Sequence, residues 1–187
     1  IRGKNNKIVK LSRGGKIRVV GNNNYIEIGK NCIMDNIPIT VYGDNNSVKI
    51  HDCVYFYTGN ILCEHGSKIE IGAGTSIHGA HINAQECSSI DIGKDCMFSG
   101  NIIVRTSDSH PIYDNTSGMR VNPAKSVVVG NHVWLGVGCN VLKGVKIGDG
   151  AVVGNGSIVT HDVPQQSIAV GIPAKVVKKD IKWNRTF

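Results

Sequence analysis

The chain has 187 residues, a formal net charge of +7, and 24 Ile and 22 Val against only 4 Leu. Leu is a leading helix former, whereas β-branched residues favour strands, so this composition excludes helical bundles and coiled coils. A hydrophobic fraction of 41% with 19% charged residues argues against disorder.

The N-terminal part of the chain, residues 1–105, repeats every 21 to 22 residues. One series, Ile-x-Ile-Gly, starts at Ile26, Ile69 and Ile90, and residues 48–51 fill the missing place. A second series of aliphatic pairs is interleaved and starts at residues 17, 39, 61 and 82. Turn-rich clusters separate the two series, so we expect a short strand at each place with its aliphatic side chains pointing inward.

The repeat fails between Val104 and Val127, where residues 106–126 are polar and turn-rich. A loop of about 20 residues without secondary structure is uncommon in a compact domain and is often functional. This one carries His110, followed by Pro111 and flanked by Asp108 and Asp114. We therefore expect residues 106–126 to be the active-site loop.

The C-terminal coils, residues 127–163, follow a strict six-residue period. A six-residue period predicts short strands that are each followed by a corner, and three such sides close a coil of 18 residues. The aliphatic residues of this row are Val129, Leu135, Val141, Ile147, Val153 and Val159. Smaller residues stand two places before each of them, and Gly often follows.

Stacked coils of this kind form parallel sheets around a narrow three-sided interior, which admits Ile and Val but few aromatic side chains. We expect a single all-β domain over residues 1–187, with one long protruding loop and a short C-terminal tail from residue 164 to 187. Of six cysteines, four lie on inward repeat positions, so reduced structural thiols are favoured over disulfides or zinc ligands. These four are Cys32, Cys63, Cys96 and Cys139.

The pattern [Ile/Val/Leu]-Gly-x-x-[small]-x resembles the hexapeptide repeat of left-handed parallel β-helix acyltransferases. The runs 106–111, 129–136, 148–164 and 169–175 resemble acetyl-CoA-dependent sugar O-acetyltransferases, which include maltose, galactoside and capsule O-acetyltransferases. The 24-residue step from His110 to Trp134 is similar to that of bacterial polysialic acid O-acetyltransferases. The resemblance implies a left-handed helix and acetyl transfer to a carbohydrate hydroxyl, with a capsule or sialic-acid-type polysaccharide as the acceptor.

In this family the loop His before Pro is the general base, which corresponds to His110, and Trp134 lies beside the thioester and acceptor. A neutral imidazole can remove the proton of a sugar hydroxyl as the oxygen attacks the thioester. The other ring nitrogen of His110 must then donate a hydrogen bond that orients the ring. Asp108, Asp114 or a backbone carbonyl are the candidate acceptors. We expect a backbone N–H near residues 134–136 to stabilise the oxyanion, and direct transfer without an acyl-enzyme.

The resemblance also implies that acetyl-CoA lies along the C-terminal coils between two subunits of a homotrimer, with no metal. Asn155 replaces a usual Ala and His161 a usual Lys, which weakens any charge contact there. The family's cofactor-binding positions correspond to Trp134, Gly136, Val137, Asn155, Thr160, His161, Lys175 and Lys178. On the acceptor side, the candidates are His78, His81 and Asn83, although the two histidines could equally be solvated corner residues.

Two other enzyme classes remain open. An N-acetyltransferase that acts on an amino-sugar nucleotide would use the same helix, although the chain lacks the G-x-G-x-x-G motif of an added nucleotide-binding domain. A zinc carbonic anhydrase on the same fold would need three converging His, and His78, His81 and His110 supply the number. A non-catalytic β-helix scaffold is a further possibility.

The positive net charge suits an acidic polysaccharide acceptor. The basic residues are otherwise scattered, with one dense cluster at Lys175, Lys178 and Lys179, so we expect no nucleic-acid binding. No run approaches the roughly 18 apolar residues of a membrane span, and residues 1–16 hold no apolar signal segment. We therefore expect a cytoplasmic protein.

Overall fold

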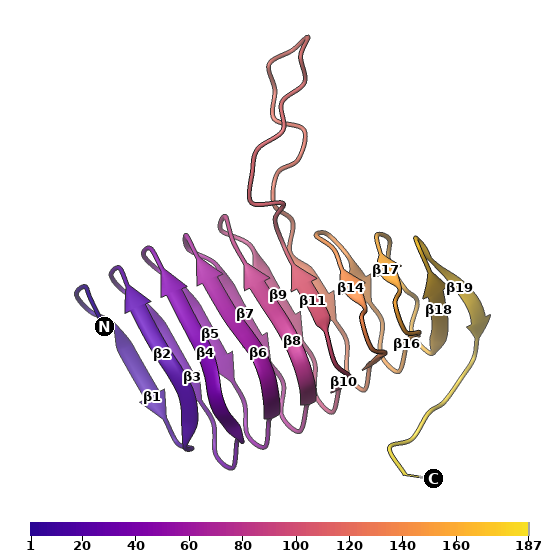
Figure 1. The fold of residues 1–187 in the computed structure, drawn as a ribbon, viewed down its shortest axis with the longest axis horizontal. Coiled ribbons are helices and arrows are strands. Elements are labelled where there is room, and N and C mark those ends of the chain that lie inside the picture. Colours follow the sequence, from indigo (N-terminus) through magenta and orange to yellow (C-terminus); the bar gives the residue numbers. More distant parts are fainter. Residues whose placement is uncertain (187) are drawn as a thin grey trace.

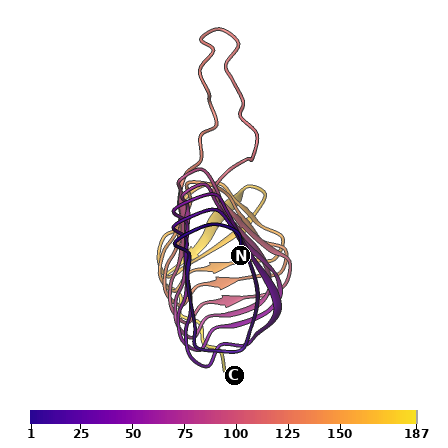
Figure 2. The ribbon, with the colours of Figure 1, turned by 90° about the vertical axis from the view of Figure 1, so that its left-hand side faces the viewer.

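The computed structural model describes residues 1–186, and all regular elements within them are β-strands. The strands wind into coils that stack along one axis, with the N-terminus at one end and β18 and β19 at the other (Figure 1). Seen along that axis, the coils enclose one narrow interior (Figure 2). This β-solenoid confirms the all-β architecture predicted from the repeats.

One side of the solenoid is a seven-stranded parallel sheet in which each strand comes from the next coil. Its ladder pairs Ile26 with Val48, Val48 with Ile69, and Ile69 with Ile90, so the first predicted series forms one continuous row. The strands in sheet order are β1 (Lys7–Lys10), β3 (Tyr25–Ile28), β5 (Ser47–Ile50), β7 (Lys68–Ile71), β9 (Ser89–Ile92), β12 (Val127–Val129) and β15 (Lys146–Ile147).

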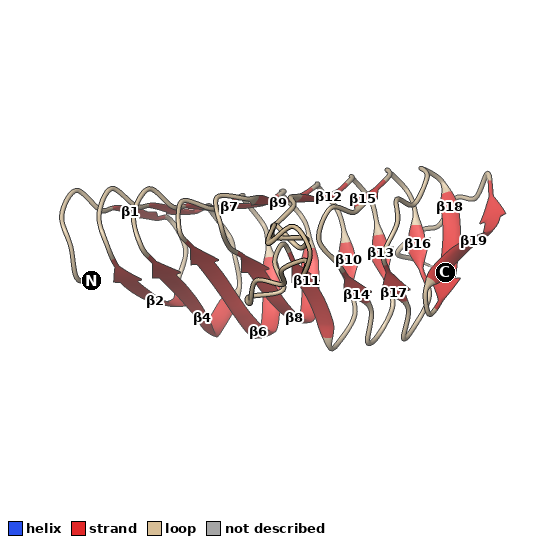
Figure 3. Ribbon diagram, turned by 90° about the horizontal axis from the view of Figure 1, so that it is seen from above, coloured by secondary structure: helices blue, strands red, loops and turns tan. Residues whose placement is uncertain are grey.

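A twelve-stranded sheet forms the other two sides, and its N-terminal coils use one long strand for both. These long strands are β2 (Gly14–Val20), β4 (Met34–Tyr42), β6 (Tyr55–Glu64) and β8 (Ser76–Ala84). After β8 two short strands replace each long one, because β8 pairs with both β10 and β11 (Figure 3). The short strands are β10 (Met97–Phe98), β11 (Ile102–Arg105), β13 (Trp134–Leu135), β14 (Asn140–Val141), β16 (Val152–Val153) and β17 (Ile158–Val159).

The core is a column of β-branched side chains that runs the length of the stack. All six aliphatic residues of the six-residue row are buried, and so are the smaller residues two places before them. The four cysteines predicted to point inward are also buried, and burial raises the pKa of Cys63 to about 12. A thiol with such a pKa carries almost no thiolate at neutral pH, which agrees with a packing role.

The corners stack as closely as the strands. A Cβ at Gly72 would lie 2.5 Å from the backbone of Gly93, and one at Gly93 would lie 2.5 Å from that of Gly130. Side chains from the next coil bind several of these corners: Asp149 Oδ1 accepts the N–H of Asn131. Each such corner therefore requires a residue without a side chain, which is why Gly recurs in the sequence pattern.

The C-terminal end closes with a pair of strands. β18 (Ser167–Gly171) continues the stack by pairing in parallel with β16, and β19 (Ala174–Lys179) runs antiparallel to β18. The chain then turns back along the solenoid (Figure 1). Residues 1–186 contain no helix of the length and hydropathy required to span a membrane.

Candidate active site

The repeat break forms an arm, residues 106–126, that projects from the corner between β11 and β12 (Figures 1 and 2). An antiparallel bridge between Tyr113 and Arg120 joins its two halves. At the tip, Asp114 Oδ1 accepts hydrogen bonds from the N–H of Thr116 and from the N–H and hydroxyl of Ser117. The arm is thus a closed hairpin with its own internal contacts.

Two ion pairs fix the base of the arm to the coils on either side. Arg120 Nη1 lies 2.6 Å from Glu86 Oε2, and Lys143 Nζ lies 2.6 Å from Asp108 Oδ2. The Arg120 hydrogen bond holds the pKa of Glu86 below its ordinary value, and the Lys143 hydrogen bond does the same for the pKa of Asp108. Both carboxylates therefore favour their ionised forms at neutral pH.

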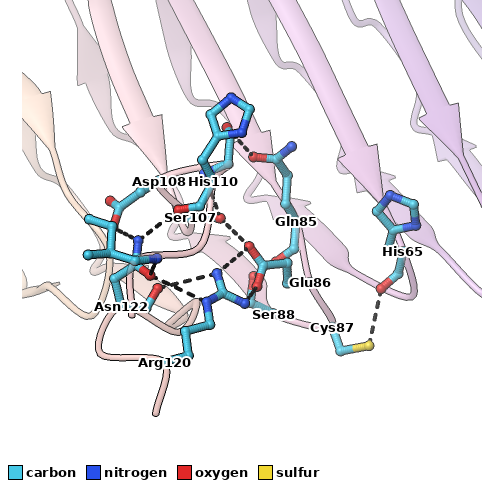
Figure 4. A network of polar contacts seen from close by, with 12 residues as sticks. His65, Gln85, Glu86, Cys87, Ser88, Ser107, Asp108, His110, Arg120 and Asn122 are labelled. Atoms are coloured by element: carbon cyan, nitrogen blue, oxygen red, sulfur yellow. Dashed lines mark hydrogen bonds and ion pairs between the residues drawn. The ribbon is translucent and has the colours of Figure 1, made fainter. Parts of the chain in front are cut away.

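Asn122 connects these groups to the histidine (Figure 4). It is 7% exposed, and its Nδ2 donates to Asp108 Oδ2 and to the backbone oxygen of His110, both at 2.9 Å. Its Oδ1 accepts the N–H of Ile112 at 2.6 Å. Sequence reasoning missed Asn122, because a single Asn in a polar loop carries no distinguishing pattern.

His110 itself is exposed, and its ring makes no hydrogen bond to any residue from 1 to 186. Asp108 and Asp114 were predicted as candidate orienters of that ring, but the structure commits Asp108 to Lys143 and Asn122 and commits Asp114 to the tip turn. Within one chain, neither carboxylate orients His110. The arm positions the backbone of His110 and leaves both ring nitrogens free.

Trp134 begins β13 on the outer surface, between Met97 of β10 and Val152 of β16. Its indole is half-buried, and its Nε1 has no hydrogen-bond partner among the described residues. The arm leaves the corner before β12, whereas Trp134 begins β13, after the corner that follows β12. The structure therefore does not bring His110 and Trp134 together within one chain.

The expected oxyanion donors near Trp134 are already used. The N–H of Trp134 donates to Ala151 O at 2.9 Å, and the N–H of Gly136 donates to Val153 O at 2.8 Å. These bonds hold adjacent coils together. The prediction of an oxyanion donor from either of these two groups is therefore wrong, whereas the unpartnered indole Nε1 of Trp134 is a donor that lies close by.

A C-terminal segment that sequence reasoning did not single out covers Trp134. Trp183 is 9% exposed and lies 5.9 Å from the Trp134 ring between centroids. It stacks on His132 at 3.9 Å with nearly parallel planes, and its Nε1 donates to the His132 oxygen at 3.0 Å. Arg185 then binds Asp95 Oδ1 at 2.8 Å and Ser76 Oγ at 2.9 Å. Trp183 is the second of only two tryptophans, and this rarity was the available signal.

The predicted cofactor-binding positions divide into three groups. Gly136, Val137 and Asn155 meet at one corner, where Asn155 Oδ1 accepts the N–H of Val137 at 3.0 Å. Thr160 and His161 follow β17 at the next corner and contact each other through Thr160 Oγ1 and His161 Nδ1, 2.8 Å apart. Lys175 and Lys178 are exposed on β19. Asn155 thus binds a corner N–H of the preceding coil, as Asp149 does.

The predicted acceptor-side residues lie on β8, next to the strand that leads into the arm. His81 pairs with Ile103 and Asn83 pairs with Arg105, the last residue before the arm. Asn83 Oδ1 and Arg105 Nε are both buried without a hydrogen-bond partner among residues 1–186. His78 is exposed and lies 5.2 Å from the ring of Tyr57. His81 and Asn83 are therefore close to the base of the arm.

No group of three or more His, Cys, Asp or Glu within residues 1–186 is arranged to hold a metal ion. His78 and His81 lie on β8, whereas His110 lies on the projecting arm.

Comparison with known proteins gives consistent results. The family described as "Bacterial transferase hexapeptide (six repeats)" matches residues 126–161. A polysialic acid O-acetyltransferase of Neisseria meningitidis is 36% identical over 94% of this chain and 82% of its own length. One of Escherichia coli O1:K1 is 40% identical over 68% of this chain, which spans 42% of that longer relative. The crystallographically analysed polysialic acid O-acetyltransferase OatWY superimposes with a TM-score of 0.90 and 33% identity, covering 100% of this chain and 90% of the other.

Proposed function

Because the chain belongs to the hexapeptide-repeat O-acetyltransferases, we propose that it moves the acetyl group of acetyl-CoA to a hydroxyl of an acidic surface polysaccharide. Polysialic acid is the first acceptor to test, because two relatives are named for it. The observation that carries the proposal is the arm, which holds His110 through Asn122 and two ion pairs and leaves its imidazole free.

In the proposed reaction, one nitrogen of neutral His110 accepts the proton of the sugar hydroxyl. The hydroxyl oxygen forms a bond to the acetyl carbonyl carbon, and the carbon–sulfur bond of the thioester then breaks. The departing CoA sulfur takes the proton from His110, so the imidazole is restored. We assign the indole N–H of Trp134 to the acetyl oxygen, because it is a buried donor without a hydrogen-bond partner among residues 1–186.

The outer surface of the C-terminal coils has groups suited to acetyl-CoA. Val137 and Ile172 are 48% and 72% exposed and would contact the apolar pantetheine arm. Lys175 and Lys178 are exposed and would meet its phosphates. Thr160 and His161 lie a corner away, which favours a contact with a different part of CoA.

His110 and Trp134 are separated within one chain, so the proposed site combines them from two subunits of a homotrimer. The arm supports this assembly because its tip exposes apolar side chains that need a covering surface. These are Ile112, Tyr113, Met119 and Val121, between 56% and 69% exposed. Light scattering on the purified protein should give three times the chain mass, and a monomer that remains fully active would contradict the shared site.

The test of the reaction is a thiol-release assay with acetyl-CoA and polysialic acid, with His110→Ala beside the wild type. We expect kcat to fall by about 10² to 10⁴ without the base, with the acetyl-CoA KM little changed. His51→Gln is the matched control, since His51 is exposed directly after β5 of the seven-stranded sheet and pairs with Glu70. Equal turnover by His110→Ala would refute the assignment.

The other two enzyme classes give distinct outcomes. Transfer to an amino-sugar nucleotide, with nitrogen acetylation detected by mass spectrometry, would favour an N-acetyltransferase. Stoichiometric zinc in the purified protein, together with CO₂ hydration, would favour a carbonic anhydrase. The cytoplasmic location stays a prediction from the sequence.

A further inference from the structure

The positive charge of the chain is concentrated at one end. Seven basic residues precede the first acidic residue, Glu27, and the other 14 basic residues are matched by 14 acidic ones. The expectation that the basic residues are scattered is therefore wrong for this region. The seven are Arg2, Lys4, Lys7, Lys10, Arg13, Lys16 and Arg18.

All seven side chains are exposed and lie on the first coil, β1 and β2 with their turns. None pairs with a carboxylate among the residues described. Asp35 lines a shallow cavity together with Lys10 and Lys16, and Glu27 lies opposite Val9 in the ladder of β1 and β3. The first described coil is thus strongly cationic, which attracts polyanions.

A straight row of outward side chains joins this end to the arm. The strand ladder pairs Arg18 with Thr40, Thr40 with Leu62, Leu62 with Asn83, and Asn83 with Arg105. Arg105 directly precedes the arm that carries His110. Adjacent strands lie about 4.8 Å apart, so the four steps of the row span roughly 19 Å.

The two ends of the row are cationic, and the middle is not. Arg18 lies over the Tyr42 ring at 5.4 Å, which orders its guanidinium. At the other end, the buried Nε of Arg105 and the buried Oδ1 of Asn83 have no hydrogen-bond partner within residues 1–186. Two carboxylates beside the row are already bound: Glu64 accepts a hydrogen bond from Gln85 Nε2 at 2.6 Å, and Asp108, which interacts with the charge of Arg105, pairs with Lys143. Such spacing suits a ligand that carries repeated negative charges along its length.

We propose that β2, β4, β6, β8 and β11 form a track for a polymeric, carboxylate-bearing glycan (Figure 3). The reacting sugar lies near the arm, and units several positions away bind the cationic first coil. The enzyme then prefers a long acceptor over a short one, a choice that the reaction chemistry alone does not impose. This inference rests on the proposed function and adds a second, remote binding region to it.

The experiment compares two double variants that remove the same charge. Lys16→Gln/Arg18→Gln changes the first coil on the track, and Lys49→Gln/Lys68→Gln changes exposed lysines on the opposite sheet. Acetyl transfer is measured with polysialic acid and with a sialic acid dimer. We expect the track variant to raise the KM for the polymer about two- to tenfold, because exposed charge contacts are individually weak.

The same variant should leave kcat, the acetyl-CoA KM and the KM for the dimer unchanged, and 1 M salt should remove the difference. The proposed track would be refuted if the two double variants raised the KM for the polymer equally, or if the track variant raised the KM for polymer and dimer equally.

Binding without acetyl-CoA separates this proposal from the proposed reaction. Retention on immobilised polysialic acid should weaken for the track variant and not for the control, even if the wild type transfers no acetyl group. Retention on a DNA duplex should be weaker than on polysialic acid at equal ionic strength. Equal retention on both supports would mean general polyanion attraction and would contradict a glycan track.

Discussion

The coils before the arm and the coils after it turn in different ways. Before the arm, the nine- or ten-residue strands β4, β6 and β8 each cover two sides of a coil. From the coil that follows β8, whose β11 leads into the arm, each side has its own strand of two to four residues, separated by a tight corner. The N-terminal coils repeat every 21 to 22 residues, against three sides of six residues in the C-terminal coils, so they present a broader outer surface. The short coils are nearly uniform, and this is the region where the hexapeptide pattern is strict.

This difference in coil structure coincides with the two substrates of the proposed reaction, which bind to different regions. The broad N-terminal surface carries the acceptor-side residues and the basic end, whereas the uniform C-terminal coils carry the positions proposed for acetyl-CoA. The arm lies between the two regions. One scaffold can therefore keep a constant site for acetyl-CoA beside a more variable acceptor surface.

The largest expected effect compares a buried side chain of the N-terminal coils with one of the C-terminal coils. Phe56→Ala, in β6, should lower the free energy of unfolding by about 3 to 5 kcal/mol, because it removes a fully buried ring. Val153→Ala, equally buried in β16, should cost about 2 kcal/mol because it removes less volume. Chemical denaturation measures both, and equal losses would contradict the larger buried volume at Phe56.

The second prediction concerns the corners, which should be alike in both regions. Gly72→Ala would press a Cβ against the backbone of Gly93, and Gly136→Ala would press one to 2.3 Å from Asn155 Oδ1. Each should lower the free energy of unfolding by about 1 to 3 kcal/mol. Gly100→Ala, where a Cβ meets open space, should stay within about 0.5 kcal/mol. A tolerated Gly72→Ala would show that the corners also differ.

The third prediction tests the division of labour. Asn83→Ala should raise the acceptor KM about three- to tenfold, because it removes a polar group beside the base of the arm. Trp183→Ala should instead raise the acetyl-CoA KM by a similar factor, because Trp134 loses its covering ring. Steady-state kinetics with each substrate varied in turn separates the two effects. Trp183→Phe should restore the wild-type KM for acetyl-CoA. If either variant changed both KM values equally, the two surfaces would not be independent.

The smallest effect concerns the arm under acid. The pKa values of Glu86 and Asp108 are lowered by Arg120 and Lys143, so their stabilisation is complete above the ordinary carboxylate pKa of about 4. It is lost as the pH falls through the lower folded values. Pepsin cleavage within residues 106–126 should therefore increase below about pH 4 while the coils stay intact. The Glu86→Gln variant should be cleaved readily above pH 4 too. Cleavage of this variant at the wild-type rate would show that the Arg120–Glu86 ion pair does not hold the arm.

The fold was readable from the sequence because solenoid packing is local. Each inward residue contacts its counterparts in adjacent coils, so a one-dimensional period of six or of 21 to 22 specifies the core directly. The site was less readable. His110 and Trp134 stand out by type and spacing, but the contacts of Asn122 and Trp183 join segments 12 and 51 residues apart. No periodic signal reports such contacts.

The same limit explains the errors. Asp108 and Asp114 are near His110 in sequence, yet Lys143 and Ser117 bind their carboxylates. The sequence does not show that the backbone N–H groups of Trp134 and Gly136 are bound to carbonyl oxygens of the next coil, so both were expected to be free to bind an oxyanion. In a solenoid the backbone of each strand is already committed to its neighbours, so free donors are found mainly on side chains.

The way the arm joins the solenoid has a consequence for how such enzymes diversify. β11 still pairs Val104 with Val141, and β12 still pairs Val127 with Ile90, so the insertion leaves the strand register on both sides intact. A corner can therefore gain or lose a long segment without a change in the hydrophobic column. Evolution can exchange the arm as a module, and an engineer could graft another arm at this corner to change the acceptor while the scaffold stays as it is.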